Sequence, residues 1–469
     1  MPKVLFILKH REHYGASGYW NEEEYGDAVL SYSSTLSSGL LNSARFIVEM
    51  LNDNGVEARL VEVLDNNYID REVAAFRPDI VFIEALWVVP DKFDVLQKLH
   101  PRVKWVVRGH SAVPFLAQEG VAIEWITGYV RRKNVVFAPN SRNLANDVRA
   151  IVGSANPSWS DSEVEAKIPF LPNYYPFQPV TPASKAPDDV LDVGCFGAIR
   201  PFKNQLTQAV AAIKYAKAIG KSLRFHINGM RVETGGASVL KNLRALFQAT
   251  GQQLVEHGWM GHPAFLSMLQ TCDVGMQVSY SETFNIVSAD MTVAGLPMVV
   301  SPAVGWASQW SKADPNSADD IAFVLALALE PSSRSTLLAR NASGLRCFCS
   351  SSQAAWLAFV KSQSDPQPAP APASPSPSKP VPQSSLVQAS VSIPIKPLVL
   401  TPFKSDPQPA PAPASVPYTP YTPLKPQSSL FRSLVGALWT YVRSFLSKPQ
   451  TTGRCSGGSW RSIPPLSPK

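Results

Sequence analysis

The sequence has little of what disulfide-linked, zinc-binding or membrane-spanning proteins need. It has five cysteines in 469 residues, and only Cys347 and Cys349 lie close together, so neither a disulfide framework nor a zinc site is predicted. No stretch reaches the roughly 18 uncharged apolar residues of a spanning helix. The apolar run at residues 4–8 is too short for a secretory signal. We therefore expect a cytoplasmic protein in a reducing compartment, attached at most to a membrane surface.

Acidic residues are scarce at one end of the chain. Residues 363–469 hold 23 of the 42 prolines and ten lysines and arginines, but only Asp365 and Asp406. Outside that segment, basic and acidic residues nearly balance, at 33 against 34. The net charge of +7 thus comes from the tail, and it gives no support to a nucleic-acid-binding role for the rest of the chain.

Short β-branched runs alternate with helical patterns in the first part of the chain. A helix is expected over residues 40–51, where apolar side chains recur every three or four positions and Gly55 can end it. Strand and helix in alternation predict a parallel, doubly wound α/β sheet, whereas an antiparallel domain would need hairpin turns that are few here. The predicted strands are residues 4–8, 58–63, 79–83, 103–107 and 135–138.

The alternation starts again after a proline-rich break at residues 172–187. We therefore predict two similar α/β domains, residues 1–178 and 186–362, with a last helix over residues 353–361. In the second domain the predicted strands are residues 190–196, 223–227, 254–257, 273–278 and 298–301. Its predicted helices are residues 204–218, 237–249, 263–271 and 283–294.

The tail differs in composition from everything before it. The sequence SDPQPAPAPAS at residues 364–374 recurs at residues 405–415, and alternating proline and alanine favour extended polyproline II without a core. We expect a disordered linker over residues 363–429, an amphipathic helix over residues 430–448 and a disordered end over residues 449–469. The helix pattern, with its flanking basic residues, fits either an anionic membrane surface or a protein groove.

The segment of residues 281–290 contains the most specific pattern for chemistry. Glu282 and Asp290 stand eight residues apart at the start of a predicted helix, and this helix leads into a buried strand. A helix N-terminus offers free N–H groups and a positive dipole to an anion. The arrangement fits a phosphorylated, polyhydroxylated ligand, although an acidic pair on a helix is also compatible with simple solvated charges.

These residues resemble the E-x7-E element of retaining glycosyltransferases with two Rossmann-like domains facing a cleft, the GT-B fold, and are most similar to glycosyltransferase family 4. Three further segments also match the family. They are His110 after the fourth strand, the turn at residues 171–173, and the glycine loop at residues 193–197 followed by Lys203. Gly15 to Gly18 resembles a first glycine loop. The resemblance covers about residues 1–362.

The resemblance also implies a role for each matching residue. Lys203 and Arg200 would neutralise the donor diphosphate, Glu282 would bind hydroxyls of the transferred sugar, Asp290 would contact the ribose, and His110 would support the sugar from the other domain. The implied donor-binding set is Gly197, Lys203, Glu282, Thr283, Phe284, Asn285 and Asp290. Retention of anomeric configuration would follow if the departing phosphate takes the acceptor proton. No cofactor and no metal are implied, with a nucleotide-diphosphate sugar as co-substrate.

Two positions depart from the family pattern. Ala198 stands where arginine is common, and Asp290 is one methylene shorter than the usual glutamate. A catalytically inactive binding or scaffold protein with the same fold is therefore an alternative, and a sugar-nucleotide epimerase is another, although no second pair of carboxylates is evident. Taken singly, Lys203 and Arg200 are compatible with surface or loop-capping roles, and His110 with a core histidine. The acceptor is left open as a glycan, a lipid-linked sugar, a protein or a modified nucleobase.

Overall fold

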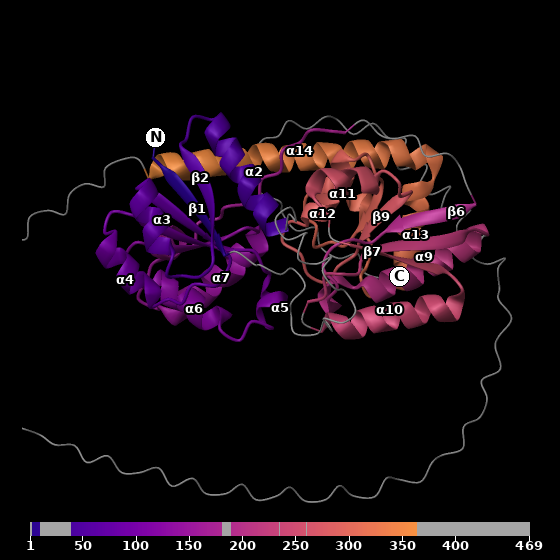
Figure 1. Cartoon of the computed structure of the whole chain (residues 1–469), viewed down its shortest axis with the longest axis horizontal. Helices are drawn as coiled ribbons and strands as arrows, with labels where there is room; N and C mark the ends of the chain where they lie inside the picture. The colour runs from indigo at the N-terminus through magenta and orange to yellow at the C-terminus, as the bar shows by residue number, and fades with distance from the viewer. Residues whose placement is uncertain (1, 10–38, 181–188, 234, 259, 364–469) are drawn as a thin grey trace, which may run out of the picture. The chain divides into compact units, whose positions relative to one another are not determined.

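The computed structural model describes residues 2–9, 39–180, 189–233, 235–258 and 260–363 (Figure 1). By their contacts these residues form one compact unit. Several predicted segments lie outside the described residues: the loop at Gly15 to Gly18, the linker after Gln363, the amphipathic helix at 430–448 and the end at 449–469. They remain predictions.

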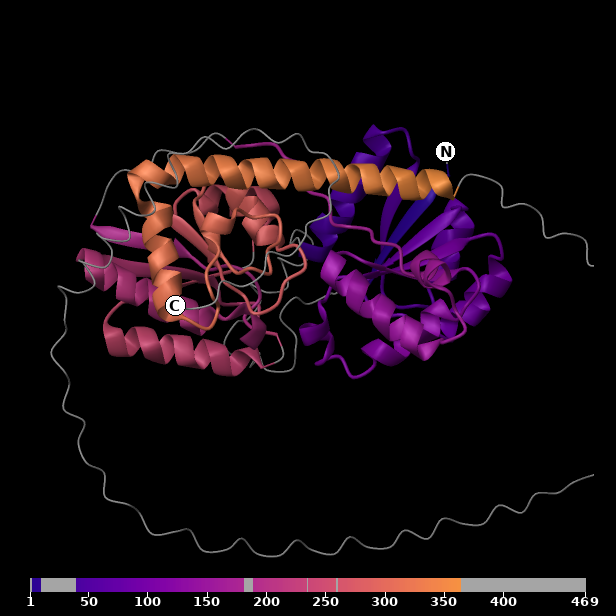
Figure 2. The same cartoon turned by 180° about the vertical axis from the view of Figure 1, so that it is seen from behind.

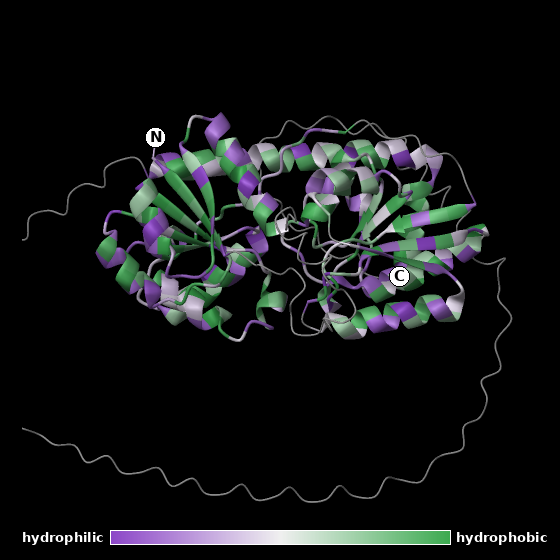
Figure 3. Ribbon diagram, viewed as in Figure 1, coloured by the Kyte–Doolittle hydropathy of each residue, from purple (hydrophilic) through white to green (hydrophobic). Residues whose placement is uncertain are grey.

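The first sheet has five parallel strands in the order β2-β1-β3-β4-β5. Strands β1, β3 and β5 are apolar and buried along nearly their whole length, which is typical of a parallel sheet covered on both faces. These strands are largely green in Figure 3. The strands are β1 Val4–Lys9, β2 Ala58–Val63, β3 Ile80–Glu84, β4 Lys104–Gly109 and β5 Val135–Pro139.

The helices of this part begin with α2, whose apolar face matches the helix predicted from the spacing at residues 40–51. Its side chains Ala44, Ile47 and Leu51 are fully buried against the first sheet. The helices are α2 Gly39–Asp53, α3 Ile69–Phe76, α4 Lys92–Leu99, α5 Val113–Leu116, α6 Ala122–Val130, α7 Arg142–Ala155 and α8 Asp161–Lys167.

The second sheet is also parallel, in the order β10-β9-β6-β7-β8. Its strands are β6 Val190–Gly194, β7 Ser222–Asn228, β8 Gln253–His257, β9 Val274–Gln277 and β10 Met298–Val300. The helices are α9 Gln205–Ile219, α10 Gly236–Thr250, α11 His262–Leu269, α12 Ile286–Val293, α13 Ala318–Leu329 and α14 Pro331–Ser362, with short 3₁₀ turns η1 Pro201–Lys203 and η2 Gln309–Ser311.

The predicted fold class is confirmed: the chain forms two parallel-sheet α/β domains. In each sheet the strand order reverses beside its first strand, between β1 and β3 and between β6 and β9. In open α/β sheets, ligands bind outside the carboxyl ends of the strands at such a reversal. The topology therefore indicates where a site should be sought before any side chain is considered.

Two predicted helices differ from the structure at their starts. Helix α12 begins at Ile286 rather than at residue 283, because Asn285 adopts a left-handed conformation (φ 60°) and caps the helix by accepting a hydrogen bond from the Ser288 N–H at 2.9 Å. The last helix, predicted over residues 353–361, is the 32-residue α14, which begins at Pro331. Its serine-rich first half lacks a clear apolar stripe, so periodicity did not indicate it.

The end of α14, orange in Figure 2, packs on the first sheet. The Trp356 ring lies 5.0 Å from Phe82 and 5.8 Å from Phe6, measured between ring centroids, and its indole N–H donates to the Pro172 carbonyl at 2.7 Å. Trp356 and Val360 are fully buried. A segment that follows the second domain in sequence therefore completes the core of the first.

Within the part of the chain that the structure describes, no single helix has the length and hydropathy of a membrane span. Only α13 and α14 taken together pass the same criterion, and they meet at an angle of 95°.

Candidate functional site

One pocket gathers most of the predicted site residues. It has a volume of about 250 Å³ and is formed by segments that follow strands of both sheets. Seven of the nine predicted residues line it, and Gly197 and Asp290 do not. The seven are His110, Arg200, Lys203, Glu282, Thr283, Phe284 and Asn285.

Lys203 and Glu282 form an ion pair at the centre of this set. Lys203 ends the η1 turn after β6, and its Nζ lies 2.6 Å from Oε1 of Glu282, which precedes α12. Both side chains are mostly buried, with 12% and 8% of their surface exposed. An incoming anion can pair with this lysine if it displaces Glu282, and the mostly buried carboxylate then needs hydrogen-bond donors from the ligand.

Gly197 shapes the loop beside this lysine rather than the pocket wall. Its φ of +111° lies in a region that favours glycine, and a Cβ at this position would lie 3.8 Å from Cε of Lys203. The Gly197 N–H donates to Oδ1 of Asn228 at 2.8 Å, which fixes the loop to the end of β7.

Arg200 occupies the pocket with different partners. Its Nη1 donates to Oε2 of Glu233 at 2.7 Å, and Arg231 donates to the other oxygen of the same carboxylate at 2.7 Å. The guanidinium also lies 4.6 Å from the centre of the Phe115 ring. Burial alone would raise the pKa of Glu233, but the charges of Arg231 and Arg200 hold it below its ordinary value. Ala198, at the position where the resemblance leads one to expect arginine, is buried.

His110 is held by a buried charge pair behind the pocket. Its Nε2 lies 2.7 Å from Oε2 of Glu84, whose two oxygens also accept hydrogen bonds from Nη1 of Arg108 at 3.1 Å. Glu84 and Arg108 are fully buried and are register partners on β3 and β4. Burial raises the pKa of Glu84, yet Arg108 and His110 outweigh it and keep that pKa below its ordinary value. Burial, together with Arg108, lowers the pKa of His110.

Asn140 links this histidine to the Glu282 segment. Its Nδ2 donates to Oγ1 of Thr283 at 3.0 Å and to Oδ1 of Asn173 at 3.2 Å, and Thr283 in turn donates to the His110 carbonyl at 3.0 Å. The amide orientation is fixed by these two bonds, and its Oδ1 is buried without a partner among the described residues. An unpaired buried acceptor on the pocket wall suits a ligand that brings a donor.

Asp290 lies apart from the pocket. It is 3% exposed on α12, and its Oδ1 accepts hydrogen bonds from the Tyr175 hydroxyl and from His262 Nε2, both at 2.7 Å. Burial raises the pKa of Asp290. The contact between His262 and Asp290 was not expected from the sequence, in which no role was assigned to His262. A ribose contact through Asp290 stays a prediction.

Two features of the site were missed in the sequence, although signals were present. Glu84 and Arg108 are charges toward the carboxyl ends of two largely apolar runs, which suggests pairing across neighbouring strands. Asn140 is a polar residue directly after the buried strand β5 and before the helix cap Ser141. Polar residues at the carboxyl ends of parallel strands were the pattern to follow.

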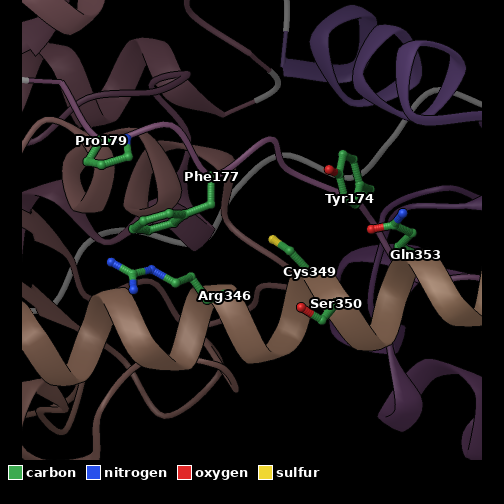
Figure 4. Close-up of a pocket in the computed structure, with 7 residues that line it drawn as sticks. All are labelled: Tyr174, Phe177, Pro179, Arg346, Cys349, Ser350 and Gln353. Carbon is green, nitrogen blue, oxygen red and sulfur yellow. The ribbon is translucent and has the colours of Figure 1, made fainter. Parts of the chain in front are cut away.

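A larger hollow of about 490 Å³ lies elsewhere, between α14 and residues 174–179 (Figure 4). Arg346 stacks over Phe177 there, with 4.5 Å between the guanidinium carbon and the ring centre. None of the predicted site residues lines it, and its wall lacks a paired cation and carboxylate in contact. We therefore place the candidate site in the smaller pocket. Among the described residues, no group of three or more histidine, cysteine, aspartate or glutamate side chains is arranged to hold a metal ion.

Comparisons with known proteins extend these observations. No protein-family model matches the chain, and no curated protein matches it. Solved structures with a similar fold include sucrose-phosphate synthase from Thermosynechococcus elongatus, with a TM-score of 0.54 and 13% identity over 77% of this chain and 98% of the other. Anabaena HepE in complex with UDP and glucose has a TM-score of 0.50 and 12% identity over 77% and 100%.

A third similar structure is the N-terminal domain of Candida albicans trehalose-6-phosphate phosphatase, with a TM-score of 0.54 and 9% identity over 78% of this chain and 97% of that one. At such identities the likeness establishes the shared fold. The predicted resemblance to GT-B proteins is supported at that level.

Proposed function

We propose that this chain transfers a sugar from a nucleotide-diphosphate sugar to an acceptor, with retention of anomeric configuration and without a metal. The observation that carries the proposal is the Lys203–Glu282 ion pair, which lines one pocket together with His110 at the carboxyl ends of two parallel sheets. Support comes from the fold, which is shared with HepE bound to UDP and glucose and with a sucrose-phosphate synthase.

The pocket's charges suit the departure of a nucleoside diphosphate. Lys203 and Arg200 are the cations on its wall, and Ile286 and Val287 at the start of helix α12 line the same wall. A helix N-terminus favours an anion nearby. Positive charge placed where a phosphate becomes more negative stabilises the transition state more than the ground state. Glu282, once released from Lys203, would accept hydrogen bonds from sugar hydroxyls.

Retention follows if the departing phosphate accepts the proton of the attacking hydroxyl on the same face of the sugar. The test is the anomeric configuration of the first-formed product, measured by proton NMR of the reaction as it proceeds. Retention predicts that the product has the same anomeric configuration as the donor. A product of inverted configuration would contradict this part of the proposal.

Metal independence follows from meeting diphosphate charge with cationic side chains and a helix N-terminus. Turnover should be unchanged in EDTA, and a loss that Mg²⁺ or Mn²⁺ restores would contradict the mechanism.

The experiment that tests donor binding is a thermal-shift screen of the full chain against UDP-, GDP-, ADP- and TDP-sugars. A ligand that binds only the folded state raises its stability by RT ln(1 + [L]/Kd), about 2.7 kcal/mol at a hundred times Kd. We expect one nucleotide series to raise the melting temperature, and this rise should be lost in Lys203→Ala.

A catalytically inactive binding protein is the second candidate, and two observations favour it. Ala198 replaces the expected arginine, and Arg200 is already paired with Glu233. Binding of a nucleotide sugar without release of nucleoside diphosphate, with every acceptor class offered, would decide for this alternative.

The composition of the tail suggests where in the cell the protein acts. We place the enzyme in the cytoplasm, with peripheral membrane contact through residues 430–448, where Arg432, Arg443 and Lys448 would add roughly 1 kcal/mol each at an anionic surface. Full-length protein should sediment with anionic vesicles at low salt, and a chain ending at Gln363 should not. Equal sedimentation of the two forms would point to a protein partner for this segment instead.

A further inference from the structure

The histidine in the pocket has a protonation state that its surroundings determine. Arg108 donates to both oxygens of Glu84, and Glu84 also lies 2.7 Å from His110 Nε2. An ionised carboxylate accepts hydrogen bonds only. Since Glu84 is fully buried against a guanidinium, it is ionised, and the proton of the short contact must be on Nε2 of His110.

The other ring nitrogen is left for the ligand. Among the described residues His110 has one side-chain partner, Glu84, so Nδ1 has none. The side chain is 15% exposed and lines the pocket with Glu282 and Lys203. A neutral imidazole with its proton on Nε2 has a lone pair on Nδ1, which accepts a hydrogen bond and donates none.

We propose that Glu84 is a positioning residue that holds the proton of His110 on Nε2, so that His110 presents an accepting Nδ1 to a hydroxyl group of the ligand. This inference rests on the proposed function for the identity of the ligand. It adds the hydrogen-bond polarity of one pocket residue and a role for a residue outside the pocket.

A hydroxyl group and a carboxylate differ in whether they can donate a hydrogen bond to Nδ1. A sugar hydroxyl donates to Nδ1 and completes the hydrogen bonding of the histidine. A carboxylate has no proton to give, and its lone pairs would meet the lone pair of Nδ1. A site built for one hydrogen-bond polarity rejects the wrong partner strongly, because buried groups are then left unpaired.

The protonation of His110 should respond in opposite directions to changes at its two neighbours. Burial and Arg108 lower its pKa, whereas Glu84 raises it. Arg108→Met should therefore raise the pKa of His110, and Glu84→Gln should lower it further. The other charged groups that line the same pocket are Arg200, Lys203 and Glu282, and both variants leave them unchanged. A purely structural role of Glu84 and Arg108 would shift neither pKa in this signed manner.

The first test needs no ligand. Full-length protein labelled with ¹⁵N in its histidine rings is examined by NMR at neutral pH, with His110→Asn used to assign the resonances among the seven histidines. We expect His110 to carry a proton on Nε2 and to be unprotonated on Nδ1. A proton on Nδ1, or on both nitrogens, overturns the inference. If neither Glu84→Gln nor Arg108→Met folds, this wild-type spectrum still decides the question.

The second test follows kcat/KM for UDP-glucose against pH. Only a neutral His110 can accept a hydroxyl hydrogen bond on Nδ1, so we expect kcat/KM to fall as pH falls and His110 takes up its second proton. The fall should begin at higher pH in Arg108→Met and at lower pH in Glu84→Gln. A value that is independent of pH, or a fall that begins at the same pH in all three proteins, overturns the inference.

The two tests separate this inference from the proposed function. If UDP-glucose neither binds nor turns over but the ring proton is on Nε2, the choice of donor is wrong while the role of Glu84 stands. If donors turn over and the ring proton is on Nδ1, the enzyme is as proposed and the role of Glu84 is wrong.

Discussion

At the scale of single residues, Lys203 and Glu282 matter because they pair with each other inside the pocket. Their contact of 2.6 Å holds a cation where an anionic ligand group could take the place of the carboxylate, while Glu282 would turn to the hydroxyls of the ligand. Arg200 and Glu233 repeat the arrangement at the neighbouring position. Both cations are thus held in place by carboxylates.

Replacing either partner should cost activity beyond any loss of stability. We expect Lys203→Ala and Glu282→Ala each to lower kcat by about 10² to 10³, in protein that is still folded at the assay temperature, although each change leaves a mostly buried charge without its partner and should lower the melting temperature. Steady-state kinetics beside a thermal melt measure both quantities. Lys214→Ala is the matched control, since it removes an exposed lysine paired with Asp319 outside the pocket, and its kinetics should be unchanged. Near wild-type rates in either pocket variant would remove the site assignment.

Asp290 gives a second prediction at this scale. Its carboxylate accepts from Tyr175 and His262 while burial raises its pKa. If its role is structural, Asp290→Asn should retain donor affinity, because the amide oxygen still accepts from Tyr175. A contact with ribose instead predicts a raised KM for the donor. Donor KM measured in this variant, with the melting temperature checked in parallel, separates the two roles.

At the scale of elements, helix α12 depends on the residue before it. Asn285 combines a left-handed backbone, a side-chain cap on Ser288 and a hydrogen bond from its Nδ2 to Oε1 of Gln277 at 3.0 Å. Asn285→Ala loses the cap, worth about 1 kcal/mol, and forces alanine into the left-handed region at roughly another 1 to 2 kcal/mol. The midpoint of urea unfolding should fall accordingly.

The control for this prediction is a cap without backbone strain. Ser160 caps α8 from an extended conformation with φ of −72° and takes part in a capping box with Glu163. Ser160→Ala should lose only the cap, and Asn285→Gly should lose the cap while keeping the backbone. A midpoint for Asn285→Ala that equals that of Ser160→Ala would show that the left-handed residue carries no cost.

The elements also show what a sequence can and cannot reveal. The strands were predictable because each is a short apolar run bounded by polar residues, glycine or proline. The observed bounds of β1, β2 and β5 match the predicted bounds within a residue or two. The start of α12 was not predictable, because the spacing of apolar residues does not indicate that Asn285 adopts a left-handed conformation. The first half of α14 was hidden by its serines. Glu84 was missed because its meaning depends on Arg108, its register partner 24 residues away.

At the scale of the whole molecule, the first domain is completed by residues from the far end of the described chain. Trp356 is fully buried against Phe6 and Phe82, and its guanidinium neighbour Arg108 lies 5.0 Å from its ring. The same Arg108 holds Glu84 behind the pocket. Helix α14 is therefore joined through one arginine to the residues that position His110.

A truncation after Gln363 should keep this core and so remain folded and able to use donor. In the same truncated chain Trp356→Ala should cost about 3 to 5 kcal/mol, the usual loss for a large buried aromatic. Chemical denaturation of the pair measures the difference. Equal stability of the two truncated chains would contradict the role of Trp356, and a truncated chain less stable than the full-length protein would mean that the proline-rich tail contributes to the folded core.

The most direct measurement of the central claim is the release of nucleoside diphosphate by the full-length protein from a panel of UDP-, GDP-, ADP- and TDP-sugars, with and without acceptors. Wild-type protein should consume one nucleotide series, release should rise with the right acceptor, and Lys203→Ala should reduce it by about 10² or more. Failure to bind or consume any member of the panel, or equal rates in wild type and Lys203→Ala, would contradict the assignment of this pocket to a nucleotide sugar.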